Sequence, residues 1–431
     1  MKDPEILQNK ALAVIGLGYV GLPLALLASK KGWKTIGIDN SSEKVVMLQR
    51  KESPIVDEKI SKDLKTTTFR ATIDFSEVKN VSIVVICVPT PVHENHVPDL
   101  GPVESACKGI APHLQKGQLV ILESTVNPGV SESVVLPILE KESGLQAGRD
   151  FYLAHCPERI NPGDTKWNVE NIPRVVGSLE EVGLMRAIEF YSSIITGAVK
   201  PMGSLQEAEA VKIVENSFRD INIAFVNELA RSFSHLGIDV VRVIEGAATK
   251  PFAFMPHYPG AGVGGHCIPV DPYYLIEYAK VNGFQHDFLA LARRINNSMP
   301  QFTAELVQSA LNEKKKAING ARVAVLGLAY KSDISDCRES PSFEIIKHLR
   351  ELGASVVAHD PFVLQKSDAQ SLDEALEGSD AVVIATAHSV FKALTPDDFK
   401  KYGIEVIVDG RNTLDKETIK KAGLVYRGIG R

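Results

Sequence analysis

Short apolar runs that alternate with helical stretches constrain this chain more than any other feature. Residues 11–15 read Ala-Leu-Ala-Val-Ile and end at a glycine, as a strand buried on both faces does. A helical pattern follows to about residue 31, and further short runs occur at 34–39, 81–89, 117–125, 151–158 and 174–178. Alternating buried strands and helices predict a doubly wound parallel sheet.

A second series of the same kind covers 321–330, 354–361, 379–387 and 404–411. Between the two series, residues 204–236 contain no glycine or proline and repeat apolar residues at helical spacing. This predicts one helix of roughly thirty residues, which either forms dimer contacts or is a spacer packed on both domains. The predicted fold class is α/β, with two Rossmann-like doubly wound domains joined by a long central helix.

A glycine pattern directly follows the first run. Gly16, Gly18 and Gly21 form G-x-G-x-x-G between strand and helix, which lets a pyrophosphate approach the helix N-terminus. Asp39 ends the second predicted strand, where its carboxylate can accept ribose hydroxyls and repel a 2′-phosphate. The pattern predicts NAD rather than NADP, unless the glycines serve only a turn.

The second series lacks this glycine pattern. Gly327-Leu328-Ala329 has one glycine where three would be expected, although Asp360 stands where the acidic residue would fall. The second domain is therefore predicted to bind something other than a dinucleotide.

Composition excludes several classes of partner. A net charge of −5 argues against nonspecific nucleic-acid binding. No apolar run approaches the roughly 18 residues of a membrane span, and the polar N-terminal stretch predicts no signal peptide. The five cysteines are scattered without a CxxC pair, which predicts no zinc site and no structural disulfide. The expected compartment is the cytoplasm.

A cysteine follows the densest glycine run, in "PGAGVGGHCIPVDP". Such a loop turns sharply or lets another group come close to its backbone. Lys212 and Asn216 lie one turn apart on the long helix, Glu158 ends a strand, and Asp271 follows four residues after Cys267. These side chains suit covalent oxidation, although an inert cysteine and a solvated lysine remain alternatives.

Eight motifs, in chain order, carry a family resemblance: "VIGLGYVGLPLA", "CVPTP", "ESTVNPG", "CPERINPG", "EAEAVKIVENSFR", "TKPFAFMPHYPGAGVGGHCIPVDPYYL", "GLAYKSDISDCRESP" and "DGRN". Over essentially its whole length the chain resembles the UDP-glucose/GDP-mannose 6-dehydrogenase superfamily, and most closely the UDP-N-acetylglucosamine 6-dehydrogenases. The resemblance implies an NAD-binding Rossmann domain (1–200), a central helical dimerisation and catalytic domain (201–300) and a UDP-sugar-binding Rossmann-like domain (301–431). It further implies a homodimer or higher homo-oligomer.

The resemblance also implies the chemistry, in which a sugar CH₂OH becomes a carboxylate with two NAD. Cys267 attacks the intermediate aldehyde, and water hydrolyses the resulting thioester. Lys212 and Asn216 match the pair that stabilises the negative oxygen of the adducts. Asp271 matches an acid that positions water and lysine, and Glu158 a general base for hydrolysis. Thr125 matches a threonine near the nicotinamide and the reacting oxygen.

Two sets of binding residues follow from the same resemblance, without a metal. The cofactor set is Gly16, Gly18, Tyr19, Val20, Gly21, Asp39, Lys44, Thr90, Thr125 and Arg338. The substrate set is Glu158, Arg159, Lys212, Asn216, Tyr258, Gly264, Lys331 and Arg411.

Departures from the UDP-glucose enzymes bear on the substrate. Those enzymes usually have Phe-Pro-Lys-Asp after the cysteine and Arg-Ile-Gly upstream, whereas residues 268–271 here read Ile-Pro-Val-Asp and 249–252 read Thr-Lys-Pro-Phe. The resemblance therefore implies UDP-N-acetylglucosamine, with UDP-N-acetylmannosamine or UDP-glucose as alternatives. Pro162 stands where many relatives have a glutamate, and His266 is expected to be a loop residue rather than a general base.

The residues alone are compatible with two further classes of protein. One is a two-electron NAD oxidoreductase of the hydroxy-acid type, with Lys212 as acid/base and Cys267 incidental. The other is a nucleotide-binding regulatory protein without turnover. Stoichiometry separates the first from the four-electron enzyme, because it yields one NADH per substrate instead of two.

Overall fold

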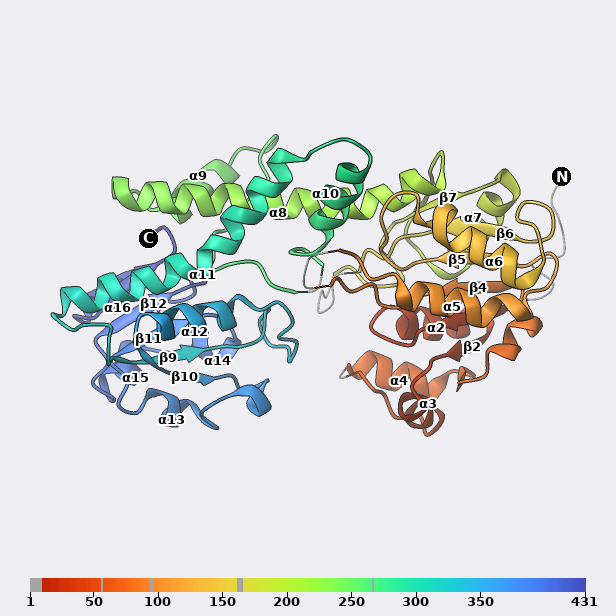
Figure 1. The fold of residues 1–431 in the computed structure, drawn as a ribbon. Helices are drawn as coiled ribbons and strands as arrows, with labels where there is room; N and C mark the ends of the chain where they lie inside the picture. The colour runs from red at the N-terminus through yellow and green to blue at the C-terminus, as the bar shows by residue number, and fades with distance from the viewer. Residues whose placement is uncertain (1–9, 56, 94–96, 161–165, 266) are drawn as a thin grey trace. The chain divides into compact units, whose positions relative to one another are not determined.

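The chain folds into two units. The computed structural model describes residues 10–55, 57–93, 97–160, 166–265 and 267–431. Unit 1 comprises Met1–Glu215 and Tyr273–Val281, and unit 2 comprises Asn216–Pro272 and Asn282–Arg431. Helix α8 (Leu205–Leu236) begins in unit 1 and ends in unit 2 (Figure 1). The domain boundaries at residues 200 and 300 stay a prediction.

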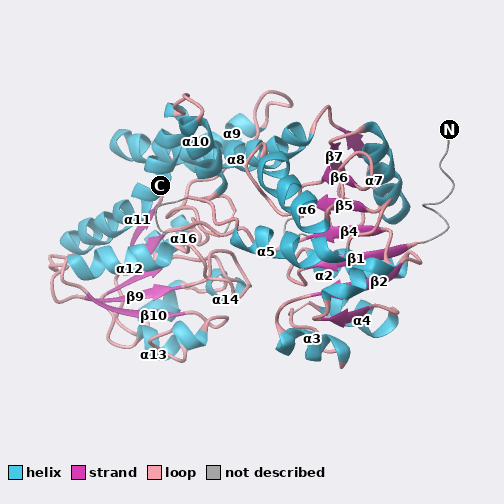
Figure 2. Ribbon diagram, turned by 45° about the vertical axis from the view of Figure 1, so that its right-hand side comes forward, coloured by secondary structure: helices cyan, strands magenta, loops and turns pink. Residues whose placement is uncertain are grey.

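Unit 1 is built on an eight-stranded sheet in the order β3-β2-β1-β4-β5-β6-β7-β8, and Figure 2 shows most of these strands as one row. The strands are β1 (Ala11–Ile15), β2 (Lys34–Ile38), β3 (Arg70–Thr72), β4 (Ile83–Ile86), β5 (Leu119–Leu122), β6 (Tyr152–His155), β7 (Arg174–Ser178) and β8 (Val199–Pro201). The predicted doubly wound α/β fold is confirmed. One pair departs from a purely parallel sheet, since β6 and β7 run antiparallel.

The connection between β6 and β7 explains this departure. A parallel neighbour needs a crossover, which a helix usually supplies. Among the described residues of 156–173 there is no helix, so the chain turns back along the edge where β6 ends. As a result, Arg174, the first residue of β7, lies at the same edge of the sheet as the carboxyl ends of β5 and β6.

Alternate residues of the strands in unit 1 face two separate cores. In β1, Leu12 and Val14 belong to one buried cluster, and Ala13 and Ile15 to the other. Helices α2, α3, α4 and α7 contribute to the first cluster, and α5 and α6 to the second. Their bounds are α2 (Gly21–Lys30), α3 (Ser42–Gln49), α4 (Glu58–Thr66), α5 (Gly101–Ile110), α6 (Leu136–Ser143) and α7 (Glu181–Ile194).

Unit 2 contains a five-stranded parallel sheet in the order β10-β9-β11-β12-β13. Its strands are β9 (Arg322–Leu326), β10 (Ser355–His359), β11 (Ala381–Ile384), β12 (Val406–Asp409) and β13 (Val425–Gly428). One face packs on α11 (Asp287–Glu313) and α12 (Pro341–Glu351). The other packs on α13 (Leu372–Leu376), α14 (Ser389–Lys392), α15 (Pro396–Lys400) and α16 (Lys416–Lys421). Helix α9 (Val240–Ala248) also belongs to unit 2, whereas most of α10 (Asp271–Val281) belongs to unit 1.

Helix α8 confirms the predicted long helix with 32 residues. Ala208 and Ala224 are buried, whereas Val214, Phe218 and Phe225 are 56%, 48% and 52% exposed. The last three recur at spacings of four and seven residues, which places them on one side of the helix. An apolar stripe on α8 thus faces away from the core of the chain.

Asp360, directly after β10, fastens the first strand–helix turn of unit 2. Its carboxylate accepts the amides of Leu328 (2.6 Å) and Ala329 (2.8 Å) and lies 2.9 Å from Nε2 of His388. Nδ1 of His388 accepts the amide of Asp333 (2.8 Å), so Nε2 carries the proton of the neutral ring. Burial alone would raise the pKa of Asp360, but these hydrogen bonds outweigh it and the pKa lies below its ordinary value.

Asp360→Asn should destabilise unit 2 by about 1–3 kcal/mol at neutral pH, because the charged acceptor of several hydrogen bonds is lost. Since the folded-state pKa is lowered, the stabilisation is fully present above the unfolded-state pKa and is lost as the pH falls through the folded-state value. Urea unfolding of wild type and variant at pH 7 and at about pH 3 measures this. The difference between the two proteins should shrink in acid, and a pH-independent difference would contradict the ionised carboxylate.

Candidate functional site

The loop between β1 and α2 has the geometry of a phosphate-binding turn. Gly16 has φ +90°, and a Cβ there would lie 2.7 Å from the carbonyl oxygen of Cys87. A Cβ on Gly21 would lie 1.9 Å from the carbonyl oxygen of Gly16. At Gly18, by contrast, a Cβ would meet nothing within 4 Å. This open surface before the N-terminus of α2 fits a pyrophosphate.

Asp39 follows β2 and is 5% exposed. Its carboxylate accepts the amides of Leu17 (2.8 Å) and Ser41 (3.0 Å) and a hydrogen bond from Nζ of Lys44 (2.7 Å). Burial opposes the charge, but the bonds from Lys44 and from the two amides outweigh it and hold the pKa of Asp39 below its ordinary value. A charged carboxylate here suits ribose hydroxyls and disfavours a 2′-phosphate.

The other predicted cofactor residues of unit 1 lie near the carboxyl ends of its strands. Val20 precedes α2, and Tyr19 is 58% exposed. Thr125 is half-buried after β5, and the carbonyl of Thr90, beyond β4, accepts a hydrogen bond from the hydroxyl of Tyr274. Ligands of doubly wound sheets bind at this edge.

Glu123, directly after β5, is the centre of a buried charge cluster. Nη1 of Arg174 lies 3.1 Å from Oε1 of Glu123 and 3.4 Å from Oε2 of Glu158. The hydroxyl of Tyr191 (2.6 Å) and the thiol of Cys87 (3.5 Å) also donate to Glu123. Burial raises the pKa of Glu123, with Arg174 acting against it. The motifs predicted a role for Glu158 but none for Glu123 or Arg174. A charged residue at the end of an apolar run was the signal that could have indicated Glu123.

Arg159 pairs with a residue of α8. Its guanidinium donates to the carboxylate of Glu215 and to the carbonyl of Pro173 (3.0 Å). Glu215 lies between Lys212 and Asn216 on the helix, and Lys212 is half-buried. The pair therefore ties the loop after β6 to the helix that carries two predicted catalytic residues. The substrate contact of Arg159 stays a prediction.

In unit 2, the structure brings together Asn216, Cys267 and Asp271. The side-chain amide of Asn216 donates to Oδ2 of Asp271 (2.5 Å). The amides of Asp271 (2.8 Å) and Val270 (3.0 Å) donate to the carbonyl of Cys267. Cys267 is half-buried at the start of this turn. His266 and Pro162, which sequence analysis singled out, lie outside the described residues.

The glycine run before Cys267 packs against the loop after β9. A Cβ on Gly264 would lie 2.7 Å from the carbonyl oxygen of Glu339, and the Gly265 amide donates to the carbonyl of Arg338 (3.1 Å). The same loop carries Lys331, which is half-buried. The guanidinium of Arg338 donates to the carboxylate of Asp336 (2.6 Å). Tyr258, upstream of the run, is 51% exposed.

Arg411, beyond β12, supports the start of this run. Its Nε donates to the carbonyl of Ala385 (2.9 Å), and its Nη1 to the carbonyl of Gly262 (3.3 Å). Asn227 on α8, which sequence analysis missed, accepts the Gly260 amide (3.0 Å). Burial lowers the pKa of Arg411, and the nearby carboxylate of Asp409 only partly offsets this effect. A cation that is incompletely compensated is suited to an anionic ligand.

Burial distinguishes Cys267 from three of the other thiols. Cys87, Cys107 and Cys156 are buried, and burial raises the pKa of Cys107 and Cys156 to about 12 and that of Cys87 well above its ordinary value. Cys267 and Cys337 are half-buried. A thiolate forms more readily where solvent or a ligand reaches the sulfur.

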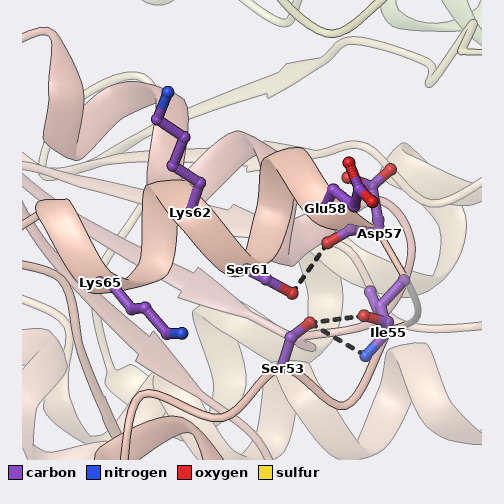
Figure 3. Close-up of a pocket in the computed structure, with 7 residues that line it drawn as sticks. All are labelled: Ser53, Ile55, Asp57, Glu58, Ser61, Lys62 and Lys65. Carbon is purple, nitrogen blue, oxygen red and sulfur yellow. Dashed lines mark hydrogen bonds between the residues drawn. The ribbon is translucent and has the colours of Figure 1, made fainter.

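A hollow of about 650 Å³ at the start of α4 contains none of these residues (Figure 3). The hydroxyl of Ser53 donates to the Ile55 carbonyl (2.7 Å), and that of Ser61 to the Asp57 carbonyl (2.9 Å). Both hydroxyls thus serve local backbone groups. Across the described residues, no cluster of His, Cys, Asp and Glu could hold a metal ion, and no helix is both long and apolar enough to cross a membrane.

The sheet order, the open glycine turn and the charged acid after β2 define unit 1 as the dinucleotide-binding unit of a dehydrogenase. Three family models match the chain. All three describe the UDP-glucose/GDP-mannose dehydrogenase family: its NAD binding domain at residues 10–195, its central domain at 206–298 and its UDP binding domain at 324–416.

Individual relatives agree with the family models. The chain is 38% identical to UDP-N-acetyl-D-mannosamine dehydrogenase of Pyrococcus horikoshii, over 97% of this chain and 99% of the relative. It is 35% identical to UDP-N-acetyl-D-glucosamine 6-dehydrogenase of Pseudomonas aeruginosa, over 97% and 99%. A solved structure of the Pyrococcus horikoshii UDP-D-ManNAc dehydrogenase superposes with a TM-score of 0.92 at 37% identity, covering 98% of this chain and 99% of that one.

The chain therefore belongs to the UDP-glucose/GDP-mannose dehydrogenase family. The protein is an enzyme, an NAD-dependent UDP-sugar 6-dehydrogenase that acts on a CH–OH group. Its cofactor is NAD, as the glycine pattern and Asp39 predicted, and a UDP-binding domain follows the central part.

Asp39→Ala should weaken NAD binding roughly 10- to 100-fold, because a charged acceptor of ribose hydroxyls is lost. Discrimination against NADP should relax at the same time, since the negative charge is gone. Calorimetric titration with NAD and NADP measures both. Asp360→Asn is the matched control, because Asp360 occupies the corresponding position in unit 2 and should leave NAD affinity unchanged. Wild-type affinity and discrimination in Asp39→Ala would contradict the assignment of the ribose site.

Proposed function

We propose that the protein oxidises C6 of a UDP-N-acetylhexosamine twice, from CH₂OH to a carboxylate, through a thioester on Cys267. The observation that carries this proposal is the hydrogen-bonded set in unit 2. Asn216 of α8 donates to Asp271 (2.5 Å), whose amide donates to the Cys267 carbonyl (2.8 Å). An amide donor and an acid are thereby held on the turn that bears an accessible thiol, as nucleophilic catalysis on a carbonyl requires.

The sulfur of Cys267 makes and breaks the covalent bond. NAD supplies the hydride acceptor for each of the two oxidations. After the first oxidation, Sγ adds to the aldehyde carbon, the thiol proton leaves, and the carbonyl oxygen becomes the hydroxyl of a thiohemiacetal. Loss of a second hydride and a proton gives the thioester. Water then cleaves the C–S bond, which releases the carboxylate and restores the thiol.

The remaining catalytic roles concern protons and the negative oxygen. Lys212 and Asn216, one turn apart on α8, stabilise the oxygen of the covalent adducts. Asp271 positions the lysine and the attacking water. Glu158 takes a proton from that water as general base, and Thr125 lies with the reacting oxygen and the nicotinamide.

Positive side chains of unit 2 hold the diphosphate. Arg411 donates to carbonyl oxygens at 2.9 and 3.3 Å, and burial opposes its charge more than the nearby Asp409 supports it. A diphosphate beside it replaces the lost hydration with a charge-assisted contact. Lys331, in the loop after β9, adds a second cation, and Arg159, Tyr258 and Gly264 complete the substrate site.

We further propose that two copies of the chain associate through α8. Val214, Phe218 and Phe225 form a stripe on one side of the helix and are each about half exposed (56%, 48% and 52%). A long helix with an apolar stripe packs well on the same helix of a second copy, since the seam then buries both stripes.

UDP-N-acetylglucosamine is the first proposed substrate, supported by the resemblance of residues 249–275 to the enzymes that oxidise it. UDP-N-acetylmannosamine is the second, because the Pyrococcus horikoshii relative named for that sugar is 38% identical. Both sugars carry an acetamido group and differ only in the configuration at C2. A pocket that contacts this group therefore favours either of them over UDP-glucose.

Cys267→Ser should lower carboxylate formation by several orders of magnitude, because the alcohol is a far poorer nucleophile near neutral pH. Wild type should release two NADH per sugar, and an acid quench should trap a sugar adduct on the peptide that contains Cys267. Cys337→Ala, which alters the other half-buried thiol, should retain both properties. Near-normal acid production by Cys267→Ala would exclude the nucleophile role.

Replacing the acetamido group by a hydroxyl should lower kcat/KM about 30- to 1000-fold, since lost methyl contacts and one lost hydrogen bond cost roughly 2–4 kcal/mol. Steady-state kinetics with UDP-N-acetylglucosamine, UDP-N-acetylmannosamine and UDP-glucose tests this. A kcat/KM for UDP-glucose equal to the best acetamido sugar would overturn the pocket argument. A higher value for UDP-N-acetylmannosamine than for its epimer would overturn only the choice of epimer.

A further inference from the structure

The buried cluster of Glu123, Arg174 and Tyr191 contacts the proposed general base Glu158 and has no assigned function. We propose that Arg174, fixed by Glu123 and Tyr191, is a positioning residue that orients the Glu158 carboxylate for thioester hydrolysis. This inference rests on the proposed function, because it concerns the hydrolysis step assigned to Glu158.

Topology brings the three strand ends together. Glu123 follows β5, Glu158 lies beyond β6, and Arg174 begins β7. Since β7 runs antiparallel to β6, its first residue reaches the edge where β5 and β6 end. A parallel β7 would place Arg174 at the opposite edge. The one antiparallel pair of the sheet therefore delivers the guanidinium to two carboxylates.

The guanidinium is held on more than one side. Arg174 is fully buried, and its Nη1 lies 3.1 Å from Glu123 and 3.4 Å from Glu158. Its carbon Cζ lies 5.5 Å from the centre of the Tyr191 ring, and the Tyr191 hydroxyl donates to the same oxygen of Glu123 (2.6 Å). Glu123 and Tyr191 thus fix the position of the cation.

Such a cluster is costly for stability alone. Nε and Nη2 of Arg174 have no hydrogen-bond partner among the described residues. Burying a donor without a hydrogen bond costs free energy. Apolar side chains of similar volume commonly replace a buried ion pair without loss of stability. The cluster is therefore better explained by what it does to Glu158 than by the stability of the sheet.

Of the two carboxylates that face Arg174, Glu158 is the less buried. Glu123 is fully buried, and burial raises its pKa, whereas the side chain of Glu158 retains 10% exposure. Solvent or a substrate can therefore reach Glu158 but not Glu123. The other titratable groups at this edge are poor charge carriers, since burial raises the pKa of Cys87, Cys156 and Tyr191 and lowers that of His155 to about 3.

Both oxygens of Glu158 are engaged. Oε2 faces Arg174, and Oε1 accepts the amide of Ile160. The next residue, Arg159, holds Glu215 on α8, beside Lys212 and Asn216. The carboxylate is therefore fixed in direction by its own loop and by the cation, which a general base needs because small displacements cost large factors in rate.

The test separates the two oxidations from hydrolysis. Rapid mixing with NAD and UDP-N-acetylglucosamine, or with its C2 epimer if that is the better substrate, gives an NADH burst followed by a slower steady state when the acyl-enzyme accumulates. Acid quench and mass spectrometry quantify the acyl group on the Cys267 peptide. The variants are Glu158→Gln, Arg174→Gln, Glu123→Leu, Glu123→Gln and, as control, Trp33→Phe.

We expect Glu158→Gln to slow acyl-enzyme breakdown by about 100-fold or more. Arg174→Gln and Glu123→Leu should slow it roughly 10- to 100-fold with little change in the first burst. Glu123→Gln keeps an oxygen for Arg174 and Tyr191 and should stay close to wild type. If Arg174→Gln does not fold, the contrast between Glu123→Leu and Glu123→Gln carries the test.

The indole of Trp33, in the same buried core, donates a hydrogen bond to the hydroxyl of Ser193 (3.0 Å). Trp33→Phe removes this donor and should not accumulate acyl-enzyme. Accumulation in this control to the extent seen in Arg174→Gln would overturn the positioning role. Wild-type breakdown in Arg174→Gln and Glu123→Leu, with accumulation in Glu158→Gln, would overturn the inference and leave the proposed function intact. No accumulation in Glu158→Gln would overturn the proposed role of Glu158 and the inference with it.

Discussion

The same kind of hydrogen bond, from a loop amide to a buried carboxylate, holds the first turn of each sheet. Asp39 accepts the amide of Leu17 at 2.8 Å, and Asp360 accepts that of Leu328 at 2.6 Å. Each bond joins the loop after the first strand of a sheet to the end of the neighbouring strand. A loop that turns away from a sheet leaves its amides without partners, and these carboxylates supply the missing acceptor. In each sheet the carboxylate thereby fixes the turn that leads from the first strand into the following segment.

The two turns diverge in what they leave open. In unit 1 the surface at Gly18 is open, whereas in unit 2 the corresponding turn ends at Ala329, which is fully buried. Asp360 also accepts the amide of Ala329, and His388 lies against it at 2.9 Å. The backbone cradle for a pyrophosphate is thus absent from the second turn. A nucleotide diphosphate in unit 2 therefore needs cationic side chains such as Arg411 in place of backbone amides.

The sequence pattern predicted those helices and strands that are determined by neighbouring residues in the chain. The buried runs gave β1, β2 and the central strands of both sheets, and the gap in glycine and proline gave α8. Strands β3, β8 and β13 were missed, because three or four residues at a sheet edge carry too little periodicity. The motifs pointed to Cys267 and Asp271. They could not pair Glu123 with Arg174, which lie 51 residues apart and meet only because β7 is antiparallel.

Three arginines with low exposure show how an acidic chain distributes positive charge. Arg293 faces one acid, Asp220 (2.6 Å), and its charge is matched within the protein. Arg174 faces two acids, Glu123 and Glu158, at 3.1 and 3.4 Å. Arg411 donates to two carbonyl groups, and Asp409 supports its charge less than burial opposes it. The three arginines therefore differ in how far the chain itself compensates their charge, although sequence composition treats them alike. A buried cation that is incompletely compensated is suited to an anion.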